Sequence, residues 1–412
     1  MRLLVVTQRY GDMIAGGAEA ACRALAERLA VRGHTVEVLT SCATSYQDWA
    51  NVFPPGTSEL NGVRVHRLPV RAPRDPQLFG PLHHRTLWGP PVSLAVQRDW
   101  LRMHGPELPA LLSYLERQAA SFDVVIFNSY LFAPAGLGAP IAAARAATVA
   151  HPAAHDEPAL ALDIFDPELR HVDAIACYST EEMDLLRQRL RASQLLVHIG
   201  TGIDANLNGD GERFRRRFGL GDRPYLLYLG RLDSAKGADE LYRFARASIQ
   251  RSNLGLALVL VGENVMQLPP ADDVVFTGFV DEQTKHDALA GATIFVNPSF
   301  FESFSMVLCE AWVQRRPALV QGASTVLAGH VRRSGGGLIY RSFADFDAAL
   351  HRLLGDPALQ AAMGARGHDY VLENFGWPVV IERYEALLAE VRTRFDAGRR
   401  PNWFTPSVGA MA

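Results

Sequence analysis

Two glutamates, Glu302 and Glu310, stand eight residues apart in a stretch that predicts a strand at 294–297, a polar loop and a helix at 306–314. In doubly wound sheets, ligands bind at the carboxyl ends of strands beside helix N-termini, where free N–H groups favour an anion. The loop places one carboxylate beside a ligand held there, and the helix places the other further along the same face. Phosphates on the N–H groups and hydroxyls on the carboxylates would suit a sugar nucleotide.

The run around these glutamates is more specific than their spacing, which is common among solvated helix charges. The string E-S-F-S-M-V-L-C-E-A resembles the E-x7-E motif of retaining GT-B glycosyltransferases, specifically family 4. Ser303 and Ser305 are the candidates for the helix N-cap. The donor-binding candidates here are Glu302, Ser303, Phe304, Ser305, Met306, Val307 and Glu310.

Two cations follow the next informative strand, predicted at 225–230. Arg231 and Lys236 lie at a strand-to-helix turn, where they are either solvated surface charges or partners of an anion. A departing nucleoside diphosphate gains negative charge, which paired Arg and Lys stabilise without a metal. The pattern G-R-L-x-x-x-K-G, beginning at Gly230, resembles the diphosphate-binding pattern of the same family.

A glycine pair, Gly16 and Gly17, lies between a predicted strand at 1–7 and a helix at 18–32. The loop does not read G-x-G-x-x-G, so a dinucleotide cofactor is not indicated. The pair either forms a tight turn or lets a phosphate approach the backbone, which only glycine permits. The string G-G-A-E resembles the glycine loop that faces the donor diphosphate in family 4, and both glycines are donor-binding candidates.

The segment HPAAHDEP, residues 151–158, places two histidines and two acids after a strand. Metal binding is not favoured, because the acids fall beside one histidine and offer no third well-spaced ligand. Family 4 enzymes carry a donor-contacting histidine in this loop, and the resemblance of -HDEP- nominates His155. His151 lies nearer the strand end and is the other candidate. Asp156 and Glu157 either bind an acceptor hydroxyl or cap the next helix.

The resemblance also bears on the nucleobase and on the catalytic residues. Gly278, Phe279 and Val280 resemble the turn where family members hold the base through backbone groups. The catalytic candidates are His155, His151, Arg231, Lys236 and Glu302.

No metal or cofactor is expected, and the nucleoside-diphosphate sugar would be a co-substrate. A metal-dependent transferase of the other common class would need a D-x-D motif. Asp345-Phe346-Asp347 matches that string but lies in a helical stretch, and we interpret it as a solvated helix edge. The resemblance implies a retaining transfer without a divalent metal.

The composition predicts a globular protein of two domains, because 412 residues exceed what one core usually fills. The net charge of −3 gives no reason to expect nucleic acid as a partner. No secretory signal and no run of about 18 apolar residues is visible, so we expect a cytoplasmic protein. Segment 64–104, rich in arginine and aromatics, is either a solvated surface or a lip that meets anionic lipid headgroups at the inner face of the membrane.

The elements that position these residues predict an α/β protein of two Rossmann-like domains facing across a cleft, and the resemblance implies that these form the GT-B fold. The expected domains are an acceptor domain at 1–204, a nucleotide-sugar domain at 205–376 and a tail at 397–412. The resemblance further implies that the helix expected at 377–396 returns to the first domain. Residues 41–117 are expected to be less regular, with a strand at 63–68, and a small helix is expected at 139–146.

The expected activity is transfer of a sugar from a UDP-, GDP- or dTDP-sugar to a glycan, lipid-linked or small-molecule acceptor. The alternative is a non-catalytic GT-B scaffold that partners an active subunit. The base, the sugar, the acceptor and the oligomeric state stay open at this level.

Overall fold

The computed structural model describes residues 1–14, 16–190 and 194–398, and it divides into two compact units. Unit 1 comprises Met1–Gly200 together with the chain from Ile381 onward, and unit 2 comprises Thr201–Val380. The division after Gly200 falls a few residues before the boundary expected at 204/205. Most of the expected tail, from residue 399 on, lies outside the described residues.

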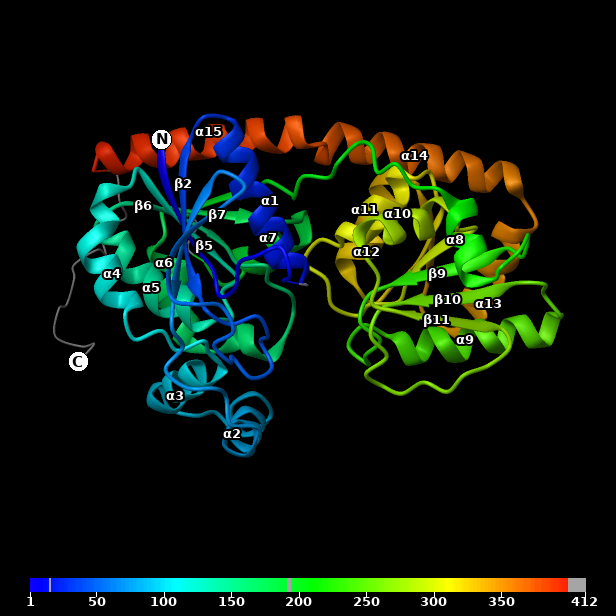
Figure 1. The fold of residues 1–412 in the computed structure, drawn as a ribbon, viewed down its shortest axis with the longest axis horizontal. Helices are drawn as coiled ribbons and strands as arrows, with labels where there is room; N and C mark the ends of the chain where they lie inside the picture. The colour runs from blue at the N-terminus through cyan, green and yellow to red at the C-terminus, as the bar shows by residue number, and fades with distance from the viewer. Residues whose placement is uncertain (15, 191–193, 399–412) are drawn as a thin grey trace. The chain divides into compact units, whose positions relative to one another are not determined.

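Unit 1 is built on an eight-stranded sheet with helices around it (Figure 1). The strand order is β3-β4-β2-β1-β5-β6-β7-β8. All neighbours are parallel except β3, which runs antiparallel to β4 at the edge. The order reverses between β1 and β5, which makes their carboxyl ends the topological switch point. The strands are β1 Arg2–Val6, β2 Thr35–Ser41, β3 Gly56–Leu60, β4 Val63–Leu68, β5 Val124–Asn128, β6 Ala147–His151, β7 Ala174–Cys177 and β8 Leu195–His198.

The helices of unit 1 include three that the sequence analysis missed, α2, α3 and α4, in the region expected to be less regular. Asp75 and Ser93 cap α2 and α3 by accepting backbone N–H groups. The small helix expected at 139–146 instead begins at Ala133 and contains Pro140. The helices are α1 Gly17–Val31, α2 Pro76–Trp88, α3 Leu94–His104, α4 Leu111–Gln118, η1 Ala119–Ser121, α5 Ala133–Ala143, η2 Pro158–Ala161, η3 Asp163–Phe165, α6 Asp166–His171 and α7 Thr180–Arg187.

Alternating side chains of the central strands bury one face of this sheet. Leu4 and Val6 of β1 and Phe127 of β5 share a core with Leu115 of α4 and Leu169 of α6. Successive strand residues point to opposite faces, so near-continuous apolar strands such as β1 require cover on both faces.

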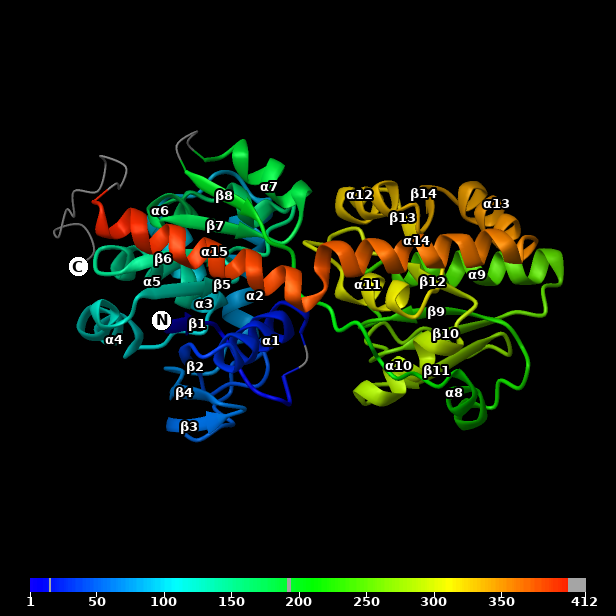
Figure 2. The same ribbon diagram turned by 90° about the horizontal axis from the view of Figure 1, so that it is seen from above.

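Part of that cover is α15, Trp377–Asp396, whose residues from Ile381 belong to unit 1 (Figure 2). Tyr384 and Leu388 are fully buried. Glu385 accepts hydrogen bonds from Arg32 at 2.9 and 3.1 Å, and Arg392 pairs with Asp123 at 3.2 Å. The C-terminal helix therefore packs on the N-terminal sheet domain, as the fold prediction expected.

Unit 2 contains a six-stranded, wholly parallel sheet in the order β11-β10-β9-β12-β13-β14. Its order reverses between β9 and β12, so the loops after these two strands flank the switch point. The strands are β9 Tyr225–Leu229, β10 Ala257–Val261, β11 Val274–Gly278, β12 Ile294–Asn297, β13 Ala318–Gln321 and β14 Gly337–Tyr340.

Seven helices of the described chain cover this sheet. Buried Trp312 of α11 donates its indole N–H to the carbonyl of Gly336 at 2.9 Å and so fixes that helix against the sheet. The helices are α8 Gly211–Phe218, α9 Ala238–Ser252, α10 Glu282–Gly291, α11 Met306–Val313, α12 Thr325–Ser334, α13 Phe343–Leu354 and α14 Pro357–Phe375.

Candidate active site

The two cations after β9 are held in place by an acid between them. Arg231 Nη2 lies 2.7 Å from Asp233 Oδ2, and the backbone N–H of Lys236 donates to Asp233 Oδ1 at 2.9 Å. Gly237 has φ 66°, and a Cβ there would overlap the carbonyl oxygen of Pro298 at the end of β12. The sequence analysis missed Asp233, although its position two residues after Arg231 in a turn was a usable signal.

Lys236 and Glu302 meet directly, from the loops after neighbouring strands β9 and β12. The distance from Lys236 Nζ to Glu302 Oε1 is 2.8 Å. The lysine side chain is 40% exposed and the glutamate side chain 14% exposed. The structure thus brings together two candidates that are far apart in the sequence, at the switch point of unit 2.

The loop before α11 leaves the first N–H groups of that helix uncapped. Ser305 is the N-cap residue with φ 77°, but its side chain makes no cap hydrogen bond. Its hydroxyl instead accepts a hydrogen bond from Asn297 Nδ2 at 2.8 Å, and Asn297 Oδ1 accepts the N–H of Ser299 at 3.1 Å. Because the first N–H groups of a helix have no partner inside it, they remain available to an anion.

The side chains of the other candidates in this loop differ in direction. Phe304 is buried, with its ring edge-on to His330 and Phe375, so it belongs to the core. Ser303, Met306 and Val307 are half-buried. Glu310 is buried, and its Oε1 lies 2.9 Å from Lys285 Nζ of α10.

The turn expected to hold the nucleobase follows β11. Gly278 ends the strand with φ 69°, and its carbonyl accepts the N–H of Gly262 at 2.9 Å. Phe279 is 79% exposed, and Val280 is half-buried. The unit 2 candidates therefore follow β9, β11 and β12 at one edge of the sheet, where parallel strands place their carboxyl ends.

The glycine loop of unit 1 rests on a buried ion pair. Arg9 Nη2 lies 2.5 Å from Glu19 Oε1, which also accepts a hydrogen bond from Gln8 Nε2 at 2.9 Å. A Cβ on Gly16 would overlap Glu19 Oε2, whereas a Cβ on Gly17 would have open space around it. Gly16 is thus required by packing, and Gly17 presents open backbone.

The structure separates the two histidines after β6. His151 is buried with its ring stacked on Tyr384, and its Nε2 lies 3.0 Å from the Tyr384 hydroxyl. Removal from water lowers the pKa of His151 to about 3, so its ring is neutral. His155 has a side chain 31% exposed, and its Nδ1 lies 3.1 Å from Glu157 Oε1. His155 therefore has the access that a substrate contact needs.

Glu182, which was not among the predicted site residues, anchors the loop that carries His155. Its carboxylate is buried and accepts the N–H of Ala154 at 2.7 Å and the N–H of Tyr178 at 2.6 Å. Burial raises the pKa of Glu182 to about 7, although these backbone hydrogen bonds act to lower it. Ala153, next to the anchored residue, has φ 55°.

The D-x-D string does not form the solvated helix edge that we expected. Asp345 is exposed, but Asp347 is buried. Asp347 accepts a hydrogen bond from Ser248 Oγ at 2.5 Å and forms an ion pair with Arg251. It faces α9 because α13 packs against that helix. Both acids thus have structural partners.

A group with metal-like geometry does occur in the described residues, at Glu282, His286 and Glu310, whose ligand atoms lie within 4.8 Å of one another. Lys285 Nζ lies 2.7 Å from Glu282 and 2.9 Å from Glu310. The ammonium group therefore already supplies positive charge to both carboxylates.

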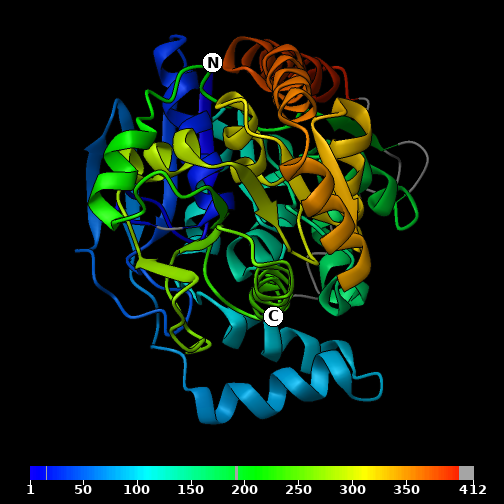
Figure 3. The ribbon, with the colours of Figure 1, turned by 90° about the vertical axis from the view of Figure 1, so that its right-hand side faces the viewer.

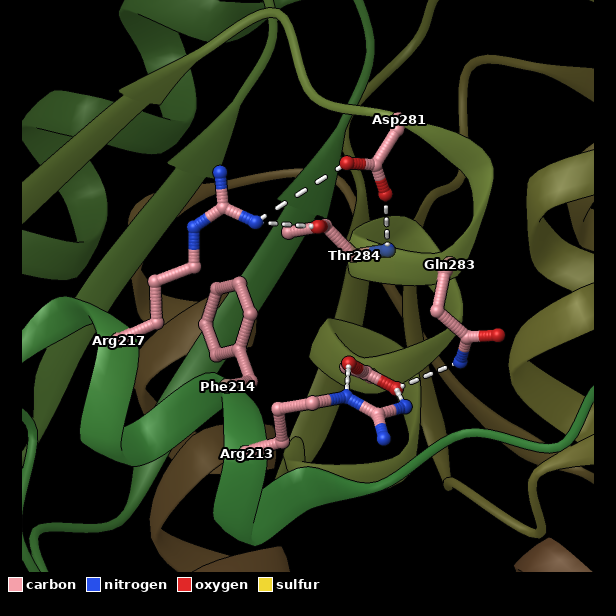
Figure 4. A pocket seen from close by; sticks show the side chains of 7 residues that line it. Arg213, Phe214, Arg217, Asp281, Gln283 and Thr284 are labelled. Carbon is pink, nitrogen blue, oxygen red and sulfur yellow. Dashed lines mark hydrogen bonds and ion pairs between the residues drawn. The ribbon is translucent and has the colours of Figure 1, made fainter.

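A pocket in unit 2 lies between α8 and α10, apart from the candidate residues described above (Figure 4). Arg213 pairs with Asp287 at 2.5 Å, and Arg217 donates to Thr284 Oγ1 at 2.8 Å and lies 4.0 Å from Asp281. Since each guanidinium faces a carboxylate, the pocket offers an anion no uncompensated charge. Its residues lie on the side of α10 that faces α8, away from the Lys285 contact with α11.

Comparison with known proteins connects this geometry to a family. Residues 223–356 match the family model of glycosyl transferases group 1, and residues 16–200 match the glycosyl transferase 4-like domain. A GDP-mannose-dependent alpha-(1-6)-phosphatidylinositol monomannoside mannosyltransferase of Mycolicibacterium smegmatis is 29% identical over 68% of this chain and 80% of its own length.

Solved structures share the fold. Sucrose-phosphate synthase from Thermosynechococcus elongatus superposes with a TM-score of 0.71 at 19% identity, over 96% of this chain and 99% of its own. Anabaena HepE in complex with UDP and glucose gives 0.69 at 15% identity, over 95% and 100%. The architecture is therefore that of a GT-B glycosyltransferase.

The two family models match consecutive parts of the chain that together span most of its length. The chain belongs to the group 1 glycosyltransferases, which confirms the resemblance inferred from the motifs.

Gly16→Ala should destabilise unit 1, because the new methyl group would push against a carboxylate that Arg9 and Gln8 hold in place. We expect a loss of about 1–3 kcal/mol in unfolding free energy. Differential scanning calorimetry would measure it. Gly17→Ala is the matched control, and an equal loss in that variant would contradict the packing argument.

Glu182→Ala should loosen the loop that carries His155, because two buried N–H groups would lose their acceptor at about 1–3 kcal/mol each. Hydrogen exchange followed by mass spectrometry should show faster exchange in peptides that cover Ala154 and Tyr178. Glu181→Ala, next to it in sequence, should leave both peptides unchanged. Unchanged protection in the Glu182 variant would show that the loop does not depend on this carboxylate.

Proposed function

We propose that this glycosyltransferase takes its sugar from a nucleoside-diphosphate sugar and that unit 2 binds this donor. The supporting observation is the pair of cations, Arg231 and Lys236, fixed at the switch point of unit 2 beside Glu302. A diphosphate needs such fixed positive charge, and the loop before α11 adds uncapped N–H groups.

Each donor group then has a counterpart in unit 2. Arg231, Lys236 and the N–H groups at the start of α11 bind the diphosphate. Glu310 accepts hydrogen bonds from the ribose diol, and Glu302 from the transferred sugar. The backbone of the turn after β11, Gly278–Val280, binds the base.

We propose a retaining transfer by attack on the same face from which the diphosphate leaves. The bond between the anomeric carbon and the phosphate oxygen breaks, and its electron pair goes to the diphosphate. The acceptor oxygen bonds to the anomeric carbon, and its proton passes to the departing phosphate oxygen. Arg231 and Lys236 stabilise the charge that develops on the leaving group.

The same cations allow the reaction to proceed without a divalent metal, because they supply the charge that a metal would supply. Turnover in EDTA should therefore equal turnover in Mg²⁺ or Mn²⁺.

We assign the acceptor to unit 1, where His155 and Glu157 form a polar pair after β6. His155 is the histidine that contacts the substrate, because its side chain is accessible. His151 instead supports the loop from inside, because it is buried and neutral.

A panel of sugar nucleotides tests the proposal against a non-catalytic scaffold. A ligand at 100 times its dissociation constant adds about 2.7 kcal/mol of stability, which a thermal-shift assay detects. The GDP-mannose in the name of the mycobacterial relative and the UDP bound to HepE make guanine and uracil the first bases to test. A scaffold would show neither binding nor donor hydrolysis, and NMR of the product's anomeric proton would report retention.

Lys236→Met and Arg231→Met should each reduce kcat on the order of 10²–10³-fold, because each removes a donor to the leaving group. Glu310→Ala should weaken nucleotide binding roughly tenfold and so reduce the stabilisation by the nucleotide by about 1.4 kcal/mol, while the protein remains folded. Arg243→Met, an exposed arginine paired within α9, is the matched control for loss of a cation. Full activity in the Lys236 and Arg231 variants would exclude the proposed role.

A lipid-linked acceptor would bring unit 1 to a membrane surface. The described residues contain no helix long and apolar enough to cross a membrane. We propose that unit 1 touches an anionic lipid surface through α2 and α3, which lie together at one side of its sheet (Figure 3). Leu78, Trp88 and Leu94 are 64%, 65% and 46% exposed. Arg85 and Arg102 are exposed on the same two helices, so apolar and cationic groups are combined as lipid headgroups require.

The double variant Trp88→Ser, Leu94→Ser should reduce sedimentation with phosphatidylglycerol vesicles, and added salt should weaken what remains. Phosphatidylcholine vesicles should bind poorly in every case. Val31→Ser removes an apolar side chain that is 84% exposed at the end of α1 and serves as control. Equal binding of both variants would show that α2 and α3 do not contact the lipid surface.

A further inference from the structure

Lys285 connects α10 to the glutamate that we assign to the ribose. Its Nζ lies 2.9 Å from Glu310 Oε1 and 2.7 Å from Glu282 Oε2. Its side chain is only 19% exposed and that of Glu310 only 10%, whereas Glu282 is 78% exposed. The ion pair with Glu310 is therefore buried, whereas the ion pair with Glu282 is exposed to solvent.

The second oxygen of Glu310 has no such partner. Within the described residues, Oε2 is buried and accepts no hydrogen bond. A buried acceptor left unsatisfied costs about 1–3 kcal/mol, so the position favours a ligand that brings a donor. Because Lys285 holds Oε1, it also fixes the orientation in which Oε2 is presented.

Lys285 is protonated at neutral pH. Burial acts to lower the pKa of Lys285, but attraction to Glu310 and Glu282 and hydrogen bonds to both raise it above the ordinary value. Without this cation, Glu310 would be a buried anion with no counter-charge, which is strongly unfavourable. His286 Nε2 lies 3.8 Å from the exposed Glu282 carboxylate.

We propose that Lys285 is a positioning residue that holds Glu310 so that Oε2 accepts a hydrogen bond from the ribose diol of the donor. The proposal rests on the proposed function. It adds that preference for a nucleotide with an intact diol depends on a side chain that itself touches no part of the donor. The geometry also assigns to Lys285 the counter-charge that Glu282, His286 and Glu310 could otherwise take from a metal ion.

Isothermal titration can isolate this role through a ratio. UDP and GDP are each compared with their 2′-deoxy and 2′,3′-dideoxy forms on the wild type and on Lys285→Met, Lys285→Arg and Glu282→Gln. In the wild type, loss of the diol should weaken binding roughly tenfold, the equivalent of about 1.4 kcal/mol. In Lys285→Met this ratio should fall to about one to two. Lys285→Arg should retain most of it, because a cation remains.

The ratio is measured on one protein preparation, so a loss of stability alone does not change it. Glu282→Gln removes only the solvent-exposed partner of Lys285 and should keep the wild-type ratio. Lys285→Gln replaces the methionine variant if that variant does not fold.

Three results would overturn the inference while the proposed function stands: no diol preference in the wild type, a wild-type ratio in Lys285→Met, or a collapsed ratio in Glu282→Gln. Failure of the wild type to bind any nucleotide would instead contradict the proposed function, and this inference, which rests on it, would fail as well.

Discussion

The ion pair between Lys236 and Glu302 is the contact around which the candidate site of unit 2 is built. It joins the loops that follow β9 and β12, the two strands between which the strand order of the sheet reverses. A half-exposed pair of this kind adds little to stability, with a median near 0–1 kcal/mol. Its value is geometric, because it holds a cation and a carboxylate at the carboxyl edge of a parallel sheet.

The same design recurs around the site. Arg231 is held by Asp233, Lys236 by Glu302, and Glu310 by Lys285. Each charged group that we assign to the donor already has an opposite charge beside it. Such groups are set before the substrate arrives, and little reorganisation remains for the reaction itself. In unit 1, Arg9 with Glu19 supports the glycine loop in a similar way.

The sequence predicted the elements of unit 2 well because their signals are local. The strand at 294–297 was placed correctly, since Pro298 closes an apolar run, and α11 begins at Met306 as expected. The strand β3 was missed because its residues are exposed and show no apolar alternation. The helices α2 and α3 were missed because prolines at 76, 81, 90 and 91 resemble loop signals, although Pro76 lies in the permitted first turn.

The site was less predictable where distant segments decide the outcome. Both His151 and His155 are candidates in the sequence, and only the contact with Tyr384, 233 residues after His151, shows that the first of them is buried. The sequence pattern predicts Asp347 as a surface acid, but α9 packs against it and Ser248 of that helix donates a hydrogen bond to it. Lys285 carries no motif, and its contact with Glu310 exists only because α10 and α11 pack together.

The helix α15 is synthesised after the whole of unit 2, yet its residues from Ile381 belong to the unit whose sheet is synthesised first. On the ribosome, unit 2 has all of its residues before unit 1 has its final helix. Until then, unit 1 lacks the side chains of Tyr384, Leu388 and Val391, which are fully buried in the folded chain. The order of translation therefore delays completion of the N-terminal sheet domain until unit 2 has been made.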